Sequence, residues 1–247
     1  MNEILYGRHA VEETLLAERR RVYRILVAES SRLSPQSALG QAARQKGIAL
    51  ESVPGHRLDQ IGPVNHQGIA AEVSPYPYAE LAEILQSTQG VNPPIILLLD
   101  CLQDPQNLAV LMRTAEAVGV RGVVLPRHRS VSVTPAVVNA SAGAIEHLRV
   151  ALVANLVRTM EILKKEGFWL AGLGDLPGAQ RYDQANLNVP LGLVVGSEGE
   201  GLGRLVKDTC DYMVRLPMTG HISSLNASTA GSIVLYEAWR QRNTGSA

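Results

Sequence analysis

The distribution of apolar residues predicts alternating strands and helices in the C-terminal part of the chain. Residues 95–99 form an uninterrupted apolar run, which is typical of a parallel strand buried on both faces. Similar runs follow, and helical patterns lie between them. The predicted strands are residues 95–99, 122–125, 168–173 and 191–195, and the clearest helices are 107–118 and 156–166. Strands that alternate with helices predict an α/β fold with a parallel sheet covered on both faces.

The N-terminal part of the chain shows a smaller α/β pattern with shorter elements. Helical periodicity alternates there with β-rich apolar runs. The predicted elements are a helix at 8–19, a strand at 22–28, a helix opened by Pro35, a strand at 48–53, a short helix and a strand at 69–73.

Two turn-rich segments separate these patterns. Residues 74–78, SPYPY, are stiff, and the polar stretch 87–94 ends in two prolines. Such composition is typical of a boundary between domains. We therefore expect an N-terminal domain at residues 1–74, a linker at 75–94 and a larger domain at 95–247.

Composition favours a soluble protein. The chain has 247 residues, 46% of them hydrophobic, and a formal net charge of zero. Charged residues interrupt the first 23 positions, and no apolar run reaches the ~18 residues of a membrane span. We expect a cytoplasmic location. Zero net charge still allows selective RNA binding through local patches, of which 19–24 and 127–129 are the candidates.

Metal and disulfide chemistry are not expected. Cys101 and Cys210 are far apart, and neither has a second cysteine or a histidine at metal-ligand spacing. The six histidines are scattered and form no HExxH motif. We predict no metal site.

A first polar loop, residues 100–107, follows the first strand of the larger domain. Asp104 before Pro105 suits a helix N-cap followed by proline at the first helical position. Asn107 and Arg113 are six residues apart, so their side chains lie within about 120° of one another around the helix. Both could face a common site, although a capped helix with a salt-bridged arginine explains them equally well.

Two further polar loops follow later strands. In residues 196–203, glycines let the backbone approach a ligand, and Glu198 could orient a ribose hydroxyl or a cation, or favour a helix N-terminus. In residues 216–226, Ser224 and Asn226 precede a predicted helix and are typical caps. Three such loops after three apolar segments favour a ligand site at the strand ends.

The three loops resemble the SpoU branch of the SPOUT RNA methyltransferases. The matching patterns are DPxN…RTAEAxG, VGSEGEGL and LPM…SSLNxSxA, within about residues 95–242. GRHAV at 7–11 and HQGIA at 66–70 are also similar to the L30e-like substrate-binding domain of that family. Ala109 departs from the family pattern, which usually has glycine there.

The resemblance implies a fold, a cofactor and a set of site residues. The fold would be a small L30e-like α/β N-terminal domain plus a SPOUT α/β domain with a parallel sheet and a C-terminal trefoil knot. The chain would form a homodimer with its active site near the subunit interface. S-adenosyl-L-methionine would bind mainly to the backbone of Gly196, Leu216 and Leu225. The catalytic and ribose-positioning set would be Asn107, Arg113, Glu198, Ser224 and Asn226.

The resemblance also implies a reaction and a substrate. Within that family, the whole chain resembles the members that methylate the ribose 2′-oxygen of a guanosine in the P loop of 23S rRNA. Because a guanidinium stays protonated at neutral pH, we expect Arg113 to stabilise the developing alkoxide or hold a phosphate; action as a general base remains open. RNA recognition would fall to the N-terminal domain with Arg8 and Arg19, Arg20 and Arg21.

Three other functions fit parts of the sequence. The same chemistry could act on tRNA or on another rRNA loop. A nucleotide-binding oxidoreductase is suggested by the glycines of residues 172–178, but the third glycine comes one position late and Pro177 intrudes. A catalytically silent RNA-binding protein of the same fold is opposed by the joint presence of four residues, Asn107, Arg113, Glu198 and Asn226.

Overall fold

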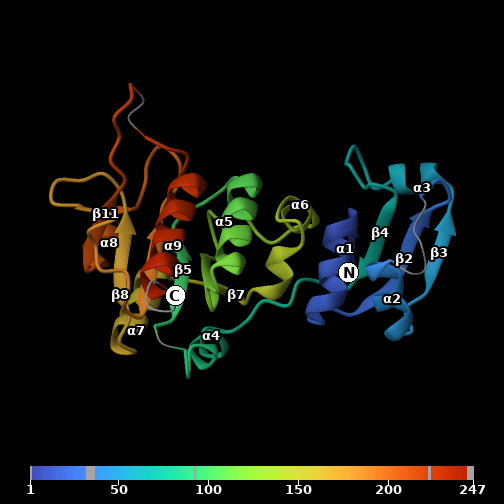
Figure 1. Ribbon diagram of the computed structural model, residues 1–247, viewed down its shortest axis with the longest axis horizontal. Coiled ribbons are helices and arrows are strands. Elements are labelled where there is room, and N and C mark those ends of the chain that lie inside the picture. Colours follow the sequence, from blue (N-terminus) through green and yellow to red (C-terminus); the bar gives the residue numbers. More distant parts are fainter. Residues whose placement is uncertain (1, 32–36, 92, 222–223, 244–247) are drawn as a thin grey trace. The chain divides into compact units, whose positions relative to one another are not determined.

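The computed structural model describes residues 2–31, 37–91, 93–221 and 224–243, and these form two compact units (Figure 1). Unit 1 comprises Met1–Pro77 and Val133–His147, and unit 2 comprises Tyr78–Ser132 and Leu148–Ala247. A short segment from the middle of the chain therefore belongs with the N-terminal residues.

Unit 1 is a four-stranded mixed sheet with short helices, and its strand order is β1-β4-β2-β3. The outer strand β1 and the inner strand β2 run antiparallel to β4, and β3 runs parallel to β2. The strands are β1 (Glu3–Tyr6), β2 (Val22–Ala28), β3 (Leu50–Val53) and β4 (Ile69–Val73), and the helices are α1 (Arg8–Ala17), α2 (Ala38–Gln45), α3 (Gly55–Asp59), α6 (Pro135–Ala140) and the 3₁₀ helix η1 (Ala144–His147). The start that we expected for α2 at Pro35 lies outside the described residues.

A glycine allows α6 to pack on β1. Gly7 has φ of +90°, and a Cβ there would lie 2.3 Å from Nδ2 of Asn139. The Asn139 side chain donates a hydrogen bond of 3.0 Å to the Tyr6 carbonyl. Glycine removes both the steric and the conformational penalty, so the residue-133–147 segment docks directly on the first strand.

Arg20 lies at the centre of a buried ion-pair network in unit 1. Its side chain is fully buried, with Nε 3.1 Å from Oε1 of Glu146 and Nη1 2.7 Å from Oε2 of Glu3. The guanidinium also lies 5.0 Å from the Tyr76 ring centroid. Burial raises the pKa of Glu146, and the attraction of Arg20 partly opposes that shift. The prediction that Arg20 contacts RNA is therefore wrong, because its charge is paired inside the unit.

Unit 2 contains a seven-stranded sheet in the order β7-β6-β5-β10-β8-β11-β9, and every described strand pair is parallel (Figure 1). The predicted α/β fold with a parallel sheet is confirmed. The strands are β5 (Ile95–Leu99), β6 (Gly122–Pro126), β7 (Val150–Val153), β8 (Trp169–Leu173), β9 (Gln180–Arg181), β10 (Leu191–Val195) and β11 (Tyr212–Arg215), and the helices are α4 (Leu81–Ser87), α5 (Pro105–Ala117), α7 (Leu156–Lys165), α8 (Arg204–Thr209) and α9 (Ala227–Asn243).

Helices cover both faces of this sheet. On one face, Ile96 and Leu98 of β5 share a core with Ile84 of α4 and Met160 of α7. On the other, α5 packs against α9, and Gly231 permits the close approach of Leu111. The alternating side chains of β5 therefore enter two separate apolar layers, as its uninterrupted apolar run predicts.

The trefoil knot stays a prediction, because residues 222–223 of the segment that would form it lie outside the described residues. Within the described ranges, no helix combines the length and the apolar character needed to cross a bilayer.

Replacing Arg20 with methionine should lower the free energy of unfolding by about 3–5 kcal/mol, because the Glu146 carboxylate is left buried without its partner. Urea unfolding followed by circular dichroism measures this change. Since burial raises the pKa of Glu146, protonation restores part of the stability in acid, and the loss should be smaller near about pH 5 than near about pH 8.

Arg21→Met is the matched control, because the exposed Arg21 side chain lies over the Tyr23 ring and forms no ion pair within the described residues. This change should cost less than about 1 kcal/mol. Equal losses for the two variants would contradict a structural role for the buried pair.

Candidate active site

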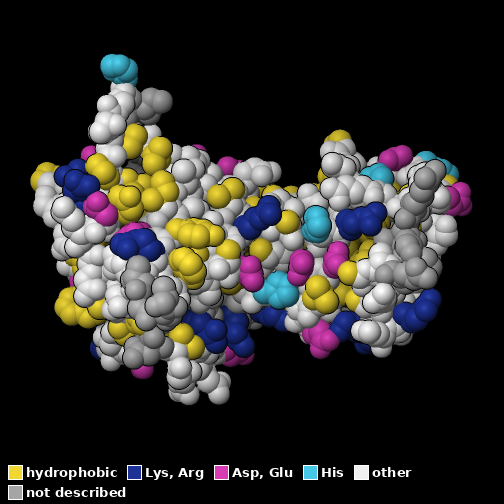
Figure 2. Space-filling view, in the orientation of Figure 1, with side chains coloured by type: hydrophobic (Ala, Val, Ile, Leu, Met, Phe, Trp, Pro, Cys, Tyr) yellow, Lys and Arg dark blue, Asp and Glu magenta, His cyan; other side chains and the backbone are white. Residues whose placement is uncertain are grey.

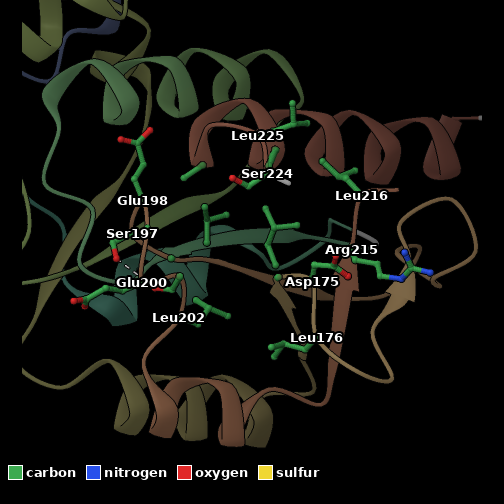
Figure 3. A pocket seen from close by; sticks show the side chains of 18 of the residues that line it. Asp175, Leu176, Ser197, Glu198, Glu200, Leu202, Arg215, Leu216, Ser224 and Leu225 are labelled. Carbon is green, nitrogen blue, oxygen red and sulfur yellow. Dashed lines mark hydrogen bonds between the residues drawn. The ribbon is translucent and has the colours of Figure 1, made fainter. Parts of the chain in front are cut away.

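The site lies at the carboxyl edge of the unit 2 sheet. Because its strands are parallel, the loops that follow them open on one edge, where ligands bind in open α/β sheets. A cavity of about 510 Å³ lies there, within the ~300–1,000 Å³ that is usual for ligand pockets. Its wall comes from the loops after β8, β10 and β11, and includes Asp175, Leu176, Gly196, Ser197, Glu198, Glu200, Leu202, Leu216, Ser224, Leu225 and Asn226 (Figure 3).

The loop after β10 forms a tight turn that leaves no room for a side chain at its first position. Ser197 and Gly201 exchange backbone hydrogen bonds of 3.2 and 3.1 Å. A Cβ on Gly196 would lie 2.3 Å from the Gly201 carbonyl carbon and 2.6 Å from the Leu202 nitrogen. Gly196 is buried, and its backbone therefore lines the pocket directly.

Asp100 joins this loop to the end of β5. Its side chain is buried, and Oδ2 accepts a hydrogen bond of 2.8 Å from the Gly203 amide, just before α8. Its own amide donates to the Val195 carbonyl at 2.8 Å. We did not single out Asp100 from the sequence, although an acidic residue directly after a fully apolar strand is the signal that could have identified it.

Asn226 begins α9. Its Oδ1 accepts hydrogen bonds from the amides of Ser228 at 2.9 Å and Thr229 at 3.1 Å. This satisfies two of the amides that the first turn of a helix leaves unpaired. The capping role that the sequence allowed is therefore present.

The same side chain also connects three loops. Its Nδ2 donates a hydrogen bond of 2.8 Å to Oδ1 of Asn107 on α5, and a second hydrogen bond to the Glu198 carboxylate. Ser228 donates to the same Asn107 oxygen at 3.0 Å. Asn107 is buried, whereas Glu198 is exposed at the pocket mouth. Three residues selected from three loops are thus in one hydrogen-bonded cluster, which we call the Asn226 cluster (Asn107, Glu198, Asn226 and Ser228).

The other predicted site residues divide into two groups. Gly196, Leu216, Ser224 and Leu225 line the cavity. In the view of Figure 3, the last three lie together along one side of it. Arg113 is exposed on α5 and is not part of the cavity wall, and its side chain makes no hydrogen bond or ion pair within the part of the chain that the structure describes. The structure therefore does not bring Arg113 into the Asn226 cluster.

The pocket mouth is acidic. Asp175, Glu198 and Glu200 are exposed around it, while the basic wall residues are Lys207 and Arg215. Nε of Arg215 donates to the Ala179 carbonyl at 3.3 Å, so this guanidinium is partly engaged. The arrangement favours a ligand with a positively charged group near the mouth.

Neither cysteine is suited to nucleophilic catalysis. Burial raises the pKa of Cys210 to about 12, and burial together with Asp100 raises the pKa of Cys101. Thiols with raised pKa values stay protonated at neutral pH, and the thiolate is the reactive form. Within the described ranges, no group of three or more His, Cys, Asp and Glu side chains could hold a metal ion.

The oxidoreductase alternative is not supported. The glycine-containing residues 172–178 lead from β8 into a turn and the two-residue strand β9. A dinucleotide fingerprint requires a helix that begins at the glycines and presents its N-terminus to the pyrophosphate. Residues 174–179, all of which the structure describes, contain no helix.

Two family models match the chain. The SpoU rRNA Methylase family matches residues 94–236, and RNA 2′-O ribose methyltransferase substrate binding matches residues 4–79. A Bacillus subtilis (strain 168) relative, YacO, whose name assigns it to the TrmH family of tRNA/rRNA methyltransferases, is 43% identical over 243 residues, or 98% of this chain and 97% of that protein.

Solved structures share the whole fold. A crystal structure of an RNA 2′-O ribose methyltransferase has a TM-score of 0.78 and 28% identity, and the match covers 98% of this chain and 89% of that one. The SpoU methyltransferase AviRb from Streptomyces viridochromogenes, in complex with the cofactor AdoMet, has a TM-score of 0.80 and 24% identity over 99% of this chain and 92% of that one. At 24% identity, the similarity to AviRb shows a shared fold and no more.

Gly196→Ala should destabilise the protein by about 1–3 kcal/mol, because the new methyl group would overlap backbone atoms that cannot move aside. Gly220→Ala is the control, since a Cβ there meets nothing within 4 Å. That change should stay within about 0.5 kcal/mol. Thermal unfolding of both variants measures the difference, and equal midpoints would contradict the tight turn.

Proposed function

Because this chain belongs to the SpoU rRNA Methylase family of RNA methyltransferases, we propose that it transfers a methyl group from S-adenosyl-L-methionine to the 2′-oxygen of an RNA ribose. The observation that carries the proposal is the Asn226 cluster, which places polar groups from three loops beside the cavity. The match of residues 4–79 to a substrate-binding domain of RNA 2′-O ribose methyltransferases supports the choice of the ribose oxygen.

The residues of the cavity fit this cofactor. Gly196 offers bare backbone in a space that a Cβ would fill, and Leu202, Leu216 and Leu225 supply apolar wall for a planar base. The exposed carboxylates at the mouth suit a positively charged ligand. When bound, S-adenosyl-L-methionine supplies an electrophilic methyl carbon, so the protein needs to provide only alignment and removal of a proton.

The Asn226 cluster positions the ribose. The Glu198 carboxylate, exposed at the mouth, accepts a hydrogen bond from a ribose hydroxyl while the Asn226 amide fixes its orientation. Asn107 holds the Asn226 amide from behind. Ser224, on the wall, hydrogen-bonds the ligand without acting as a nucleophile, because no described His or Lys is hydrogen-bonded to it.

Arg113 acts electrostatically in this proposal. Its guanidinium has no partner in the described residues and remains able to bind an oxyanion or an adjacent phosphate. Since Arg113 lies outside the cavity wall, a second subunit is the natural means of completing the site.

We propose a homodimer that forms through α9. Tyr236 and Trp239 of this helix are 53% and 43% exposed, and with Tyr182 and Ile233 they line a shallow apolar groove. Figure 2 shows hydrophobic side chains gathered over α9. Contiguous exposed apolar surface of this kind marks a protein interface.

The proposed substrate is 23S rRNA, and the proposed target is the guanosine of the P loop in the peptidyl-transferase centre. Methylation would take place in the cytoplasm. The finer choice rests on the resemblance of the sequence motifs to the members of the family that modify 23S rRNA. A tRNA or another rRNA loop is the second candidate, and the name of the Bacillus subtilis relative covers both RNA classes. A silent RNA-binding protein would bind RNA without methyl transfer.

Transfer of a labelled methyl group to protein-free 23S rRNA, with tRNA in parallel, tests the reaction and the substrate together. Mapping by nuclease protection should locate one ribose-methylated guanosine in the P loop. Label in tRNA alone would move the substrate to the second candidate, and no label in any RNA would contradict methyl transfer.

Arg113→Ala should lower the methyl-transfer rate about 10²–10³-fold, the usual effect of removing one oxyanion-stabilising donor. Affinity for S-adenosyl-L-methionine, measured by calorimetry, should not change, because Arg113 lies outside the cavity wall. Arg113→Lys keeps the charge and loses the planar pair of donors, so its activity should be intermediate. Nearly full turnover of the lysine variant would refute the role assigned to the guanidinium.

Trp239→Asp should convert the dimer to a monomer in analytical ultracentrifugation, because it places a charge in the apolar groove. Leu205→Asp is the control, since Leu205 is 62% exposed but lies on α8, which packs against α7 on the other face of the sheet. Loss of the dimer in both variants, or in neither, would count against the α9 interface.

A further inference from the structure

Along the strands β7-β6-β5-β10-β8, the carboxyl edge of the unit 2 sheet is divided by charge; beyond β8, the end of β11 carries the basic Arg215. Since the strands are parallel and ordered β7-β6-β5-β10-β8, the loops that follow them lie in the same order along the edge. The loops after β5, β10 and β8 carry acidic side chains, and the segments after β6 and β7 carry basic ones. The acidic residues are Asp104, Asp175, Glu198 and Glu200, and the basic residues are Arg127, Arg129 and Arg158.

The stretch of chain that carries the three arginines is poor in carboxylates of its own. Between residues 119 and 160 the sequence has a single acidic residue, Glu146. That residue belongs to unit 1, where its side chain is buried against Arg20. The part of this stretch that belongs to unit 2 therefore has no acidic residue at all.

The three arginines are available for a ligand. All three are exposed, and within the described ranges their side chains form no hydrogen bond or ion pair. Arg158 lies in the first turn of α7, where the helix dipole already favours an anion. The dipole of α7 does not stabilise the positive charge of Arg158 at this end of the helix. An anion bound from outside explains the position of Arg158 better.

The loop that carries Arg127 and Arg129 is anchored on both sides. The Arg127 amide donates to the Val153 carbonyl at 2.8 Å, at the end of β7. The Val131 amide donates to the Leu102 carbonyl at 2.8 Å, in the loop that leads to α5 and Asn107. Arg129 has φ of +59°, a conformation that non-glycine residues rarely adopt and that needs such support.

We propose that Arg127, Arg129 and Arg158 bind the phosphates of the RNA strand that flanks the target nucleotide. The strand leaves the pocket mouth at Glu198, passes the loop after β5 and continues over the ends of β6 and β7. One guanidinium group can bind two phosphate oxygens at once, whereas the Asp175 carboxylate, after β8, disfavours the opposite path. This inference rests on the proposed function and adds the path that the RNA strand takes over the ends of β6 and β7.

The test measures RNA binding separately from methyl transfer. Filter binding of 23S rRNA to the full chain is recorded over a range of salt concentrations for the wild type, Arg127→Ala/Arg129→Ala and Arg158→Ala. The double variant should weaken binding at least about tenfold and reduce the slope of log K against log salt by about one for each arginine removed. Affinity for S-adenosyl-L-methionine, measured by calorimetry, should stay unchanged and shows that the variants are folded.

Arg149→Ala is the matched control, because Arg149 is also exposed but lies before β7, at the opposite edge of the sheet. Its affinity and salt slope should equal those of the wild type. If the double variant and Arg158→Ala behaved like this control, the proposed RNA path would be overturned. If they lost RNA binding while the wild type bound RNA without methylating it, the path would stand and the proposed reaction would fail.

Discussion

One asparagine side chain fixes the geometry of the site. Oδ1 of Asn226 begins α9 by accepting two amides, and Nδ2 donates to Asn107 and to Glu198. Asn226 and these two partners follow three different strands, so a single amide couples parts of the chain more than a hundred positions apart. Loss of the Nδ2 donor of Asn226 would leave the buried Oδ1 of Asn107 with one hydrogen bond fewer. The residues of the Asn226 cluster therefore depend on one another.

The parallel sheet makes this coupling possible. Its strands end at one edge, and α5 and α9 pack together on one face, so their N-terminal turns meet beside the cavity. Asp100 then holds the end of the β10 loop against β5, and Gly196 keeps that loop closed enough for backbone to form the wall. Site and fold are therefore stabilised by the same few contacts, and the chemistry needs little beyond alignment.

Much of this was predictable from the sequence, for identifiable reasons. Fully apolar runs such as 191–195 predicted the buried strands. Asn226 was predicted both as a helix cap and as a site residue, and it fills both roles because Oδ1 accepts from α9 while Nδ2 donates to Asn107. Burial of Arg20 was not predictable, because its partner Glu146 lies far along the chain in a segment that joins unit 1. Short strands such as β11, in which polar and apolar residues are mixed, show too little alternation of hydrophobicity to be predicted as strands.

The most direct test of this account is the affinity of Asn226→Asp for S-adenosyl-L-methionine. Aspartate keeps the oxygen that caps α9 but loses the Nδ2 donor and adds a negative charge beside Glu198. We expect a lowered unfolding midpoint, because the buried Asn107 oxygen loses a donor, although the cap of α9 is kept. In calorimetry we expect a loss of affinity of at least about tenfold, equivalent to about 1.4 kcal/mol. An affinity equal to that of the wild type would contradict the central role of the Asn226 cluster in holding the pocket.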